Sequence, residues 1–433
     1  MEQNRFTLQN GLKVIHYFLP ATKSVIISLM IKTGSFNEQR SEYGMAHFME
    51  HTLGESTVQF SDEGNKQIML ESHGIIENAW TSKNITNYYL KTPIVHFSLA
   101  CKVLFDRVFS TIFKEESIQK QKAIILEELK MRKDNPVIMA WNNLSQQLFQ
   151  DSNLSHLTIG TSETVENFTL DTLTHFYERN YSIDKMLLWV GGNIDAETVK
   201  KVLQKLSIPL SNKDVNKKID TPVYRKRKKE SISFQEMDIQ NYYVLVGFNG
   251  FLIQQKNLLE SVLAATILGS GRGSILYNTL RVKLSLVSDI GTELECYLQD
   301  GILYTLFATN KEKVLKALSA IVDEINKFDT KRLTPDMLKR SKNMIRSYLL
   351  KHEESAEQFI EGSSSLNFVQ RELLTGKVFN FDEEVEKIKK STKKDILKSV
   401  LNKINQSHAG ISIVGKDKIS FDSIAEILQR LHK

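Results

Sequence analysis

The sequence predicts an α+β protein made of two homologous domains, each a mainly antiparallel sheet covered by helices. Apolar or alternating runs of strand length are interleaved with long segments whose apolar residues recur at helical spacing. The order of strand, helix, strand and long helix then begins again after a charged stretch, which is typical of a duplicated fold. We therefore expect domains at residues 1–210 and 231–433, joined by a linker at 211–230.

The first half opens with a predicted β-hairpin. Asn10-Gly11, a pair typical of two-residue hairpin turns, lies between alternating runs at 5–9 and 12–18. The nearly continuous apolar run at 25–33 predicts a strand that is covered on both faces. The other elements expected in this half are helices at 43–53, 66–73, 97–113, 116–133 and 196–206 and strands at 75–81, 87–92 and 186–191.

The second half repeats this plan. We expect strands at 242–247 and 302–308 and helices at 258–268 and 311–328. Thr334-Pro335 opens a further helix that runs to about Leu350, with Thr334 as N-cap and Pro335 at the first helical position. The stretch between the halves is rich in Lys, Asn and Asp and includes a basic run at 225–229, which is typical of a solvated linker; a binding patch is the alternative.

Composition and charge exclude several classes of protein. Of the 433 residues, 41% are hydrophobic and 25% charged, which is ordinary for a protein with a sizeable core. The formal charge of +6 is too weak for the dense basic field of a nucleic-acid binder. The apolar run at 25–31 is far shorter than the ~18 residues of a membrane span.

The cysteines and the N-terminus indicate the compartment. Cys101 and Cys296 could form at most one bridge, and we expect both to be buried, reduced thiols in a reducing compartment. The polar start at 1–6 lacks the charged-then-apolar order of a secretory signal. The sequence therefore predicts a cytoplasmic protein without a disulfide framework.

The most informative stretch is an H-x-x-E-H motif in the helix predicted at 43–53. At ~100° per residue, His47 and His51 lie about 40° apart around the helix, and Glu50 falls on the same side. Two imidazoles one turn apart can bind one tetrahedral metal ion, and the carboxylate can reach a metal-bound water. This order is the signature of inverted zinc peptidases. The alternative, three polar side chains on a solvated face, conflicts with the apolar residues around the motif, since burying polar groups needs a reason.

A third protein ligand must come from elsewhere, and a carboxylate would leave one position for water. Glu127 and Glu128, on a long amphipathic helix, are the candidates. Glu128 has Ile124 and Ile125 one turn before it and Met131 one turn after it, which places it nearer the centre of the apolar stripe. An unpaired carboxylate would be costly there, so we prefer Glu128 and keep Glu127 as the alternative.

With the residues around them, these motifs resemble the pitrilysin family of zinc peptidases, which includes insulin-degrading enzyme and mitochondrial processing peptidase. The similar segments are the lead-in at 32–38 and 44–46, the Asn-Ala-Trp-Thr edge strand at 78–81 with 86–88, the distal ligand segment at 126–129 and, in the second half, 269–274 and 280–281. The resemblance covers most of residues 1–195 and is thinner beyond them. It implies that the protein forms half of a clamshell.

The resemblance also implies roles for individual residues. His47, His51 and Glu128 would bind one zinc ion, and Glu50 would be the general base toward the zinc-bound water. Asn78 and Ala79 would offer an edge strand to an extended peptide substrate, which binds by strand addition. Taken alone, these two residues are explained equally well by core packing.

Two positions depart from the family pattern. Members that act with their own second half carry an Arg and, seven residues later, a Tyr that both reach the scissile peptide; this chain has Arg281 but Ser288. Arg281 alone could be a solvated helix residue. Some members carry a Glu seven residues before the distal ligand, where this chain has Gln121. The missing Tyr implies that a second homologous subunit supplies the Arg/Tyr pair, and we expect a heterodimer rather than a homodimer.

The function implied by the resemblance is that of a zinc metalloendopeptidase. It would cleave short or unfolded peptides in an enclosed chamber, and the processing of a leader or precursor peptide is one natural task. The alternative is a catalytically inactive scaffold or partner subunit of a heteromeric peptidase. Such members typically lose the zinc ligands, and all four motif residues are present in this chain. Manganese or cobalt would also suit the ligand set.

Overall fold

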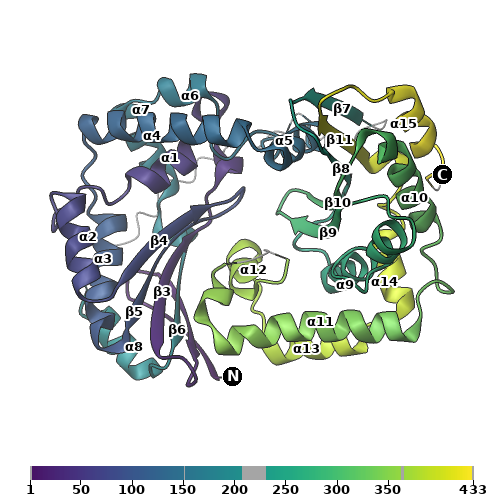
Figure 1. Cartoon of the computed structure of the whole chain (residues 1–433). Helices are drawn as coiled ribbons and strands as arrows, with labels where there is room; N and C mark the ends of the chain where they lie inside the picture. Colours follow the sequence, from purple (N-terminus) through teal and green to yellow (C-terminus); the bar gives the residue numbers. More distant parts are fainter. Residues whose placement is uncertain (1, 151, 207–230, 362–364, 432–433) are drawn as a thin grey trace.

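A computed structural model describes residues 2–150, 152–206, 231–361 and 365–431 (Figure 1). The expected linker at 211–230, with its basic run, lies outside the described residues. Two sheets, each accompanied by helices, form the two halves of the molecule and face one another (Figure 1). The predicted α+β class with two sheet domains is therefore confirmed, while the division at 211–230 stays a prediction.

The first sheet has six strands in the order β1-β2-β6-β3-β5-β4, and only β2 and β6 run parallel. The strands are β1 (Glu2–Thr7), β2 (Lys13–Phe18), β3 (Ser24–Ile31), β4 (Ile76–Thr81), β5 (Thr86–Pro93) and β6 (Met186–Gly192). The hairpin predicted at Asn10-Gly11 joins β1 to β2 and is confirmed. β3 lies between β6 and β5 and is buried along almost its whole length, as its continuous apolar run predicts. β4 forms the edge of the sheet.

Helices from the first half pack on this sheet around one apolar core. They are α1 (Met45–Thr52), α2 (Glu63–Ser72), α3 (Phe97–Phe109), α4 (Glu115–Lys133), α6 (Ser162–Glu166), α7 (Leu170–Asn180) and α8 (Ala196–Gln204). The core combines residues of β3, α1 and α3, among them Ile27, Phe48 and Leu104. Short 3₁₀ helices lie at η1 (Ser35–Asn37), η2 (Arg40–Glu42), η3 (Ile94–His96) and η4 (Ile183–Lys185). The buried position of α1 in this core decides where the motif histidines lie.

The second sheet repeats five strands of the first. Its order is β7-β11-β8-β10-β9, and only β7 and β11 run parallel. The strands are β7 (Ser231–Glu236), β8 (Tyr242–Asn249), β9 (Asp289–Cys296), β10 (Gly301–Thr309) and β11 (Ala409–Gly415). This order and these directions match β2-β6-β3-β5-β4, so the duplication expected from the sequence pattern is present in the topology. β9 corresponds to β4 and likewise forms an edge.

The helices of the second half are α9 (Leu258–Leu268), α10 (Val314–Asn326), α11 (Pro335–Glu354), α12 (Phe368–Thr375), α13 (Phe381–Lys390), α14 (Lys393–Val400) and α15 (Phe421–Leu428). Shorter helical segments are η5 (Tyr277–Lys283), which is π-helical, and the 3₁₀ helices η6 (Lys311–Lys313), η7 (Ala356–Phe359) and η8 (Gln406–His408). The predicted cap of α11 is confirmed, because the side chain of Thr334 accepts a 3.2 Å hydrogen bond from the Met337 amide. The helix continues beyond Leu350 to Glu354.

Two elements tie the halves together. α5 (Pro136–Leu148) belongs to the first half of the sequence but packs on the second sheet, where Leu144 and Leu148 join a core with Leu245 and Ile302 (Figure 1). α12 lies against the first sheet, and Glu372 accepts two hydrogen bonds, of 2.8 and 2.9 Å, from Arg5 on β1. The two sheets are therefore held in a defined relative position.

The cysteine prediction is confirmed in part. Cys101 and Cys296 are both buried, and no disulfide joins them. Within the described ranges, no helix is both long enough and apolar enough to cross a membrane.

Two glycines bring backbone segments together at the start of α1. Gly44 (φ +98°) precedes α1, and Gly160 (φ +80°) lies against it. A Cβ on Gly160 would lie 2.1 Å from the Tyr43 carbonyl oxygen, and one on Gly44 would lie 2.5 Å from the Ile159 carbonyl oxygen. Because backbone cannot move aside as a flexible side chain can, both positions require glycine.

Gly160→Ala should lower the free energy of unfolding by about 2–5 kcal/mol, because it adds a steric clash to an unfavourable φ. Gly11→Ala is the matched control: Gly11 also has a positive φ (+91°), but a Cβ there would meet no atom within 4 Å. This control should cost only about 1–2 kcal/mol. Urea unfolding of both variants measures the difference, and equal losses would contradict the close approach at Gly160.

Candidate metal centre

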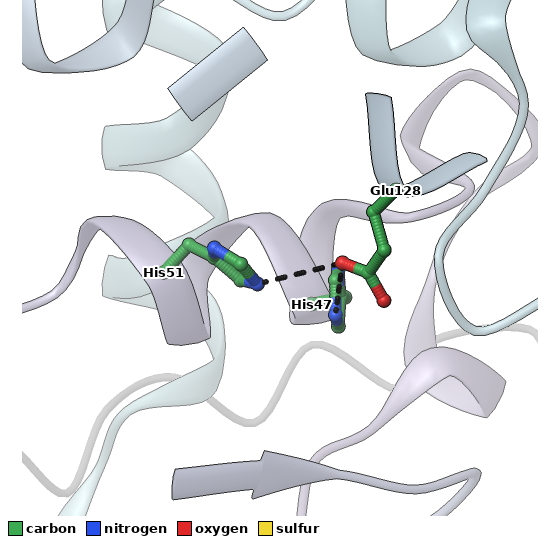
Figure 2. Close-up of side chains that lie close together, drawn as sticks. All are labelled: His47, His51 and Glu128. Atoms are coloured by element: carbon green, nitrogen blue, oxygen red, sulfur yellow. Dashed lines mark ion pairs between the residues drawn. The ribbon is translucent and has the colours of Figure 1, made fainter. Parts of the chain in front are cut away.

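α1 and α4 bring three predicted ligands together. His47 and His51 lie one turn apart on α1, and Glu128 reaches them from α4 (Figure 2). Glu128 Oε2 lies 3.7 Å from His47 Nε2 and 3.9 Å from His51 Nε2. The ligand atoms of the three residues all lie within 4.8 Å of one another. Two imidazole nitrogens and one carboxylate oxygen thus surround one point.

The structure distinguishes Glu127 from Glu128, the two candidates for the third ligand. The Glu127 side chain is 68% exposed and pairs with Lys130 at 2.6 Å, pointing away from the histidines. The Glu128 side chain is 30% exposed, and its second oxygen, Oε1, accepts a 2.9 Å hydrogen bond from Arg132 Nε. Arg132 therefore holds one carboxylate oxygen while the other faces the two imidazoles.

The apolar stripe that the sequence predicts for this helix differs from the buried face of α4, so this prediction was wrong in detail. Ile124 is 43% exposed and Met131 72% exposed, so neither belongs to the buried face of α4. That face is made of Ile118, Gln121, Ile125 and Leu129. Glu128 lies at its edge rather than its centre, since the helix packs on α1 through a narrower stripe than the sequence pattern indicates.

The three side chains fit a zinc ion. Separations of 3.7 and 3.9 Å exceed hydrogen-bond length, so the donor atoms leave space for a small cation between them. Burial, with His51 and Arg132 nearby, lowers the pKa of His47 to about 3, so its imidazole is neutral and offers a lone pair. Neutral imidazole is the form that binds metal, and two imidazoles with one carboxylate are a known catalytic zinc set.

Glu50 lies on the same helix but connects to the edge strand. Its Oε2 accepts a 2.5 Å hydrogen bond from the hydroxyl of Thr81 on β4. Burial raises the pKa of the Glu50 carboxyl, while the Thr81 hydrogen bond, His51 and Arg107 oppose that rise. A carboxyl with a raised pKa is suited to accept a proton and return it.

The predicted substrate strand lines a large cavity between the two sheets. Asn78 and Ala79 of β4 border a cavity of about 1070 Å³, and 292–296 of β9 border it from the second sheet. Asn78 also donates a 3.1 Å hydrogen bond to the Tyr89 hydroxyl, so part of its role is structural. The edges of both sheets therefore meet the same space.

Arg281 is not brought to this site. It lies exposed on η5, with its guanidinium 5.8 Å from the centre of the Tyr277 ring, and it does not line the cavity. Ser288, at the position where the family has Tyr, donates a 3.1 Å hydrogen bond to the Ala308 carbonyl. A substrate role for Arg281 stays a prediction.

Sequence reasoning missed a buried ion-pair network beneath the C-terminal end of α1. Glu77 of β4 pairs with Lys66 of α2 and with Arg107 of α3, each at 3.0 Å. Arg107 also donates to the carbonyl oxygens of Glu50, at 3.0 Å, and Leu53, at 2.9 Å. All three charged side chains are at most 10% exposed. The three charged residues are visible in the sequence, but which of them pair with one another depends on the tertiary fold.

The N-terminal end of α1 is capped from a distance by Glu38. Its carboxylate accepts hydrogen bonds from the amides of Gly44, at 2.9 Å, and Ala46, at 2.7 Å. His156 Nε2 lies 2.8 Å from the same carboxylate. Burial and the nearby Lys83 lower the pKa of His156 to about 2, so this imidazole is neutral. Burial raises the pKa of Glu38 well above its usual range, while the hydrogen bonds from the two amides oppose that rise. A carboxylate at a helix N-terminus also interacts favourably with the helix dipole.

Glu77→Gln should destabilise the protein by about 3–5 kcal/mol, because it leaves two buried cations without their counter-charge. Glu127→Gln is the control, since it removes one partner of an exposed ion pair and should cost less than about 1 kcal/mol. Chemical unfolding measures both. A loss below about 1 kcal/mol for Glu77→Gln would mean that the network contributes little to holding α1.

Comparison with known proteins extends the resemblance to most of the chain. The profile described as "Insulinase (Peptidase family M16)" matches residues 13–162, and that described as "Peptidase M16 inactive domain" matches 167–345. An uncharacterized zinc protease of Rickettsia bellii is 28% identical over 95% of this chain and 97% of that protein. Mitochondrial-processing peptidase subunit beta of Saccharomyces cerevisiae is 22% identical over 90% of this chain and 86% of that protein.

A solved structure shows the same fold. The crystal structure of a protease from Helicobacter pylori superposes with a TM-score of 0.86 over 96% of this chain and 99% of that chain, at 19% identity. The two matching profiles follow one another along the chain, and the first contains all four motif residues. The chain therefore belongs to peptidase family M16, the pitrilysin family of zinc proteases, in its short two-domain form.

Proposed function

We propose that this protein is a zinc metalloendopeptidase in which His47, His51 and Glu128 hold the ion. The observation that carries the proposal is the convergence of the three ligand atoms within 4.8 Å, beside a buried carboxyl on the same helix. When bound, zinc supplies Lewis acidity toward a water molecule and the peptide carbonyl. Arg132 keeps the Glu128 carboxylate oriented by holding the oxygen that faces away from the histidines.

Glu50 is the general base of the proposed reaction. It takes a proton from the attacking water and passes it to the amine of the leaving peptide, so that it ends the cycle ionised. Burial supports this role by raising the pKa of the carboxyl toward neutral pH. The Thr81 hydroxyl holds one carboxylate oxygen, which fixes the direction of the other.

An extended peptide would bind along β4. The edge at Asn78 and Ala79 borders the 1070 Å³ cavity, and main-chain hydrogen bonds to an edge strand demand little of the substrate sequence. A folded protein cannot present extended main chain inside such a cavity. The substrates are therefore short or unfolded peptides, and leader or precursor peptides are a natural class.

A second homologous subunit would complete the chamber. The chain has Ser288 where a Tyr would be needed, and Arg281 does not line the cavity, so the Arg/Tyr pair would come from the partner in a heterodimer. The name of one relative, a processing-peptidase subunit, supports this assembly. Two buried cysteines that are not joined in a disulfide support a cytoplasmic setting.

The first experiment measures the zinc content of the purified chain. The wild type should carry about one zinc per chain, and Glu128→Gln should lose it, because an amide is a far weaker ligand than a carboxylate. Glu127→Gln, the adjacent exposed position, should keep the metal. Absence of zinc from the wild type, with no uptake from micromolar zinc, would overturn the proposal and favour the inactive-scaffold function.

Glu50→Gln separates the base from the ligands. It should keep zinc at the wild-type level and abolish cleavage of a library of unstructured peptides, since the amide cannot accept the proton. Unchanged turnover would remove Glu50 from the mechanism.

Thr81→Val should move the acid limb of the pH–activity profile to higher pH. The Thr81 hydrogen bond lowers the pKa of Glu50, so its loss raises that pKa further, and fewer molecules carry an ionised base at a given acidic pH. Thr81→Ser, which keeps the hydroxyl, is the control and should leave the limb in place. The profile of kcat/KM against pH tests this, and a shift to lower pH would contradict the role of Thr81.

A further inference from the structure

His51 reaches a buried carboxylate through the amide of Gln121. The ring nitrogen Nδ1 of His51 lies 3.2 Å from Gln121 Oε1, on the side of the ring away from Glu128. The amide nitrogen of Gln121 donates a 2.7 Å hydrogen bond to Glu55 Oε1. Gln121 and Glu55 are 5% and 6% exposed. The three side chains form a continuous hydrogen-bonded relay, which begins at the half-buried His51 and ends at the buried Glu55.

The relay permits one orientation of the amide. A carboxylate can only accept hydrogen bonds, so Glu55 requires the NH₂ end of Gln121 to face it. The carbonyl end of Gln121 must then face His51 and can only accept, so Nδ1 of His51 carries the proton. In a neutral imidazole the other nitrogen then has the lone pair, and in His51 that nitrogen is Nε2, which faces Glu128.

Lys120 forms an ion pair with Glu55. Its ammonium donates to Glu55 Oε1 at 2.8 Å and to Glu63 Oε2 at 3.0 Å. His47 offers a contrast, since its Nδ1 is buried without a hydrogen-bond partner among the described residues. Among the described residues, a side-chain hydrogen bond to Nδ1 therefore orients the ring of His51 but not that of His47.

We propose that Glu55 is a positioning residue of the metal centre, which fixes the Gln121 amide and through it the His51 tautomer that can bind the ion. The inference rests on the proposed zinc site, but not on peptidase activity. It also explains how this chain functions with Gln121 where some relatives carry a carboxylate: the carboxylate lies one hydrogen bond further away, on Glu55.

Glu55→Gln tests the proposal. An amide at position 55 can donate as well as accept, so Gln121 can turn its NH₂ group toward His51 and favour the Nε2–H tautomer, which cannot bind metal. Zinc affinity, measured by titrating the metal-free protein against a chromophoric chelator, should fall by about 10–100-fold. Unchanged affinity would overturn the proposal.

The double variant Glu55→Gln/Gln121→Glu is the decisive rescue. A carboxylate at position 121 can only accept from His51 Nδ1, whatever stands at position 55. Affinity should therefore return to within about threefold of wild type, well inside the 10–100-fold loss expected for the single variant. A double variant that binds zinc as weakly as Glu55→Gln would show that Glu55 acts in another way, and would overturn the proposal.

Two further variants keep the test interpretable. Glu63→Gln removes the other partner of Lys120 without touching the relay and should leave zinc affinity unchanged; a loss equal to that of Glu55→Gln would assign the effect to Lys120 and overturn the proposal. If Glu55→Gln does not fold, Gln121→Met removes the amide but keeps the Glu55–Lys120 pair, and it should give the same loss. Wild-type zinc binding without peptide cleavage would contradict the proposed function alone.

Discussion

The burial of α1 is the constraint on which the rest of the site depends. The helix has only the eight residues Met45–Thr52, yet it packs in an apolar core while carrying two candidate ligands and the candidate base, of which His47 is buried and Glu50 and His51 are half-buried. So short a helix is not stable by itself, and its ends leave backbone groups without partners. Glu38 accepts from the amides at its first turn, and Arg107 donates to the carbonyls at its last. Both ends are thus held by ionisable side chains that the core would otherwise exclude.

These charged groups link α1 to the surfaces that would meet a substrate. Arg107 is balanced by Glu77, which lies on β4 one residue before Asn78. Thr81, at the end of the same strand, holds the Glu50 carboxylate. A displacement of β4 would therefore act on α1 at two points. Through Glu77 and Arg107 it would reach the backbone carbonyl of Glu50, and through Thr81 it would reach the Glu50 side chain. This connection explains why three charges are tolerated in a place where apolar side chains would pack without desolvation cost.

Much of the fold and the centre of the site could be predicted from the sequence, because they follow from local periodicity. The hairpin at Asn10-Gly11, the buried strand β3 and the one-turn spacing of His47 and His51 are of this kind. The crossing of α5 to the second sheet could not be predicted, since an amphipathic pattern shows that a face is buried but not against what. The same limit hid the Glu77 network and the relay from Glu55, whose partners are brought together only by tertiary packing.

The duplicated domain allows α1 to be compared with its counterpart in the second half, α9. α9 follows β8 as α1 follows β3, and these strands occupy equivalent places in the two sheets. Yet α9 is apolar along almost its whole length, with ten of its eleven residues buried and no histidine among them. Its C-terminal end is nevertheless held as that of α1 is, because Arg340 donates a 3.1 Å hydrogen bond to the Thr266 carbonyl in the last turn. An arginine that donates to a carbonyl of the last turn is therefore common to both helices and belongs to the shared scaffold, whereas the two histidines are carried by α1 and not by α9.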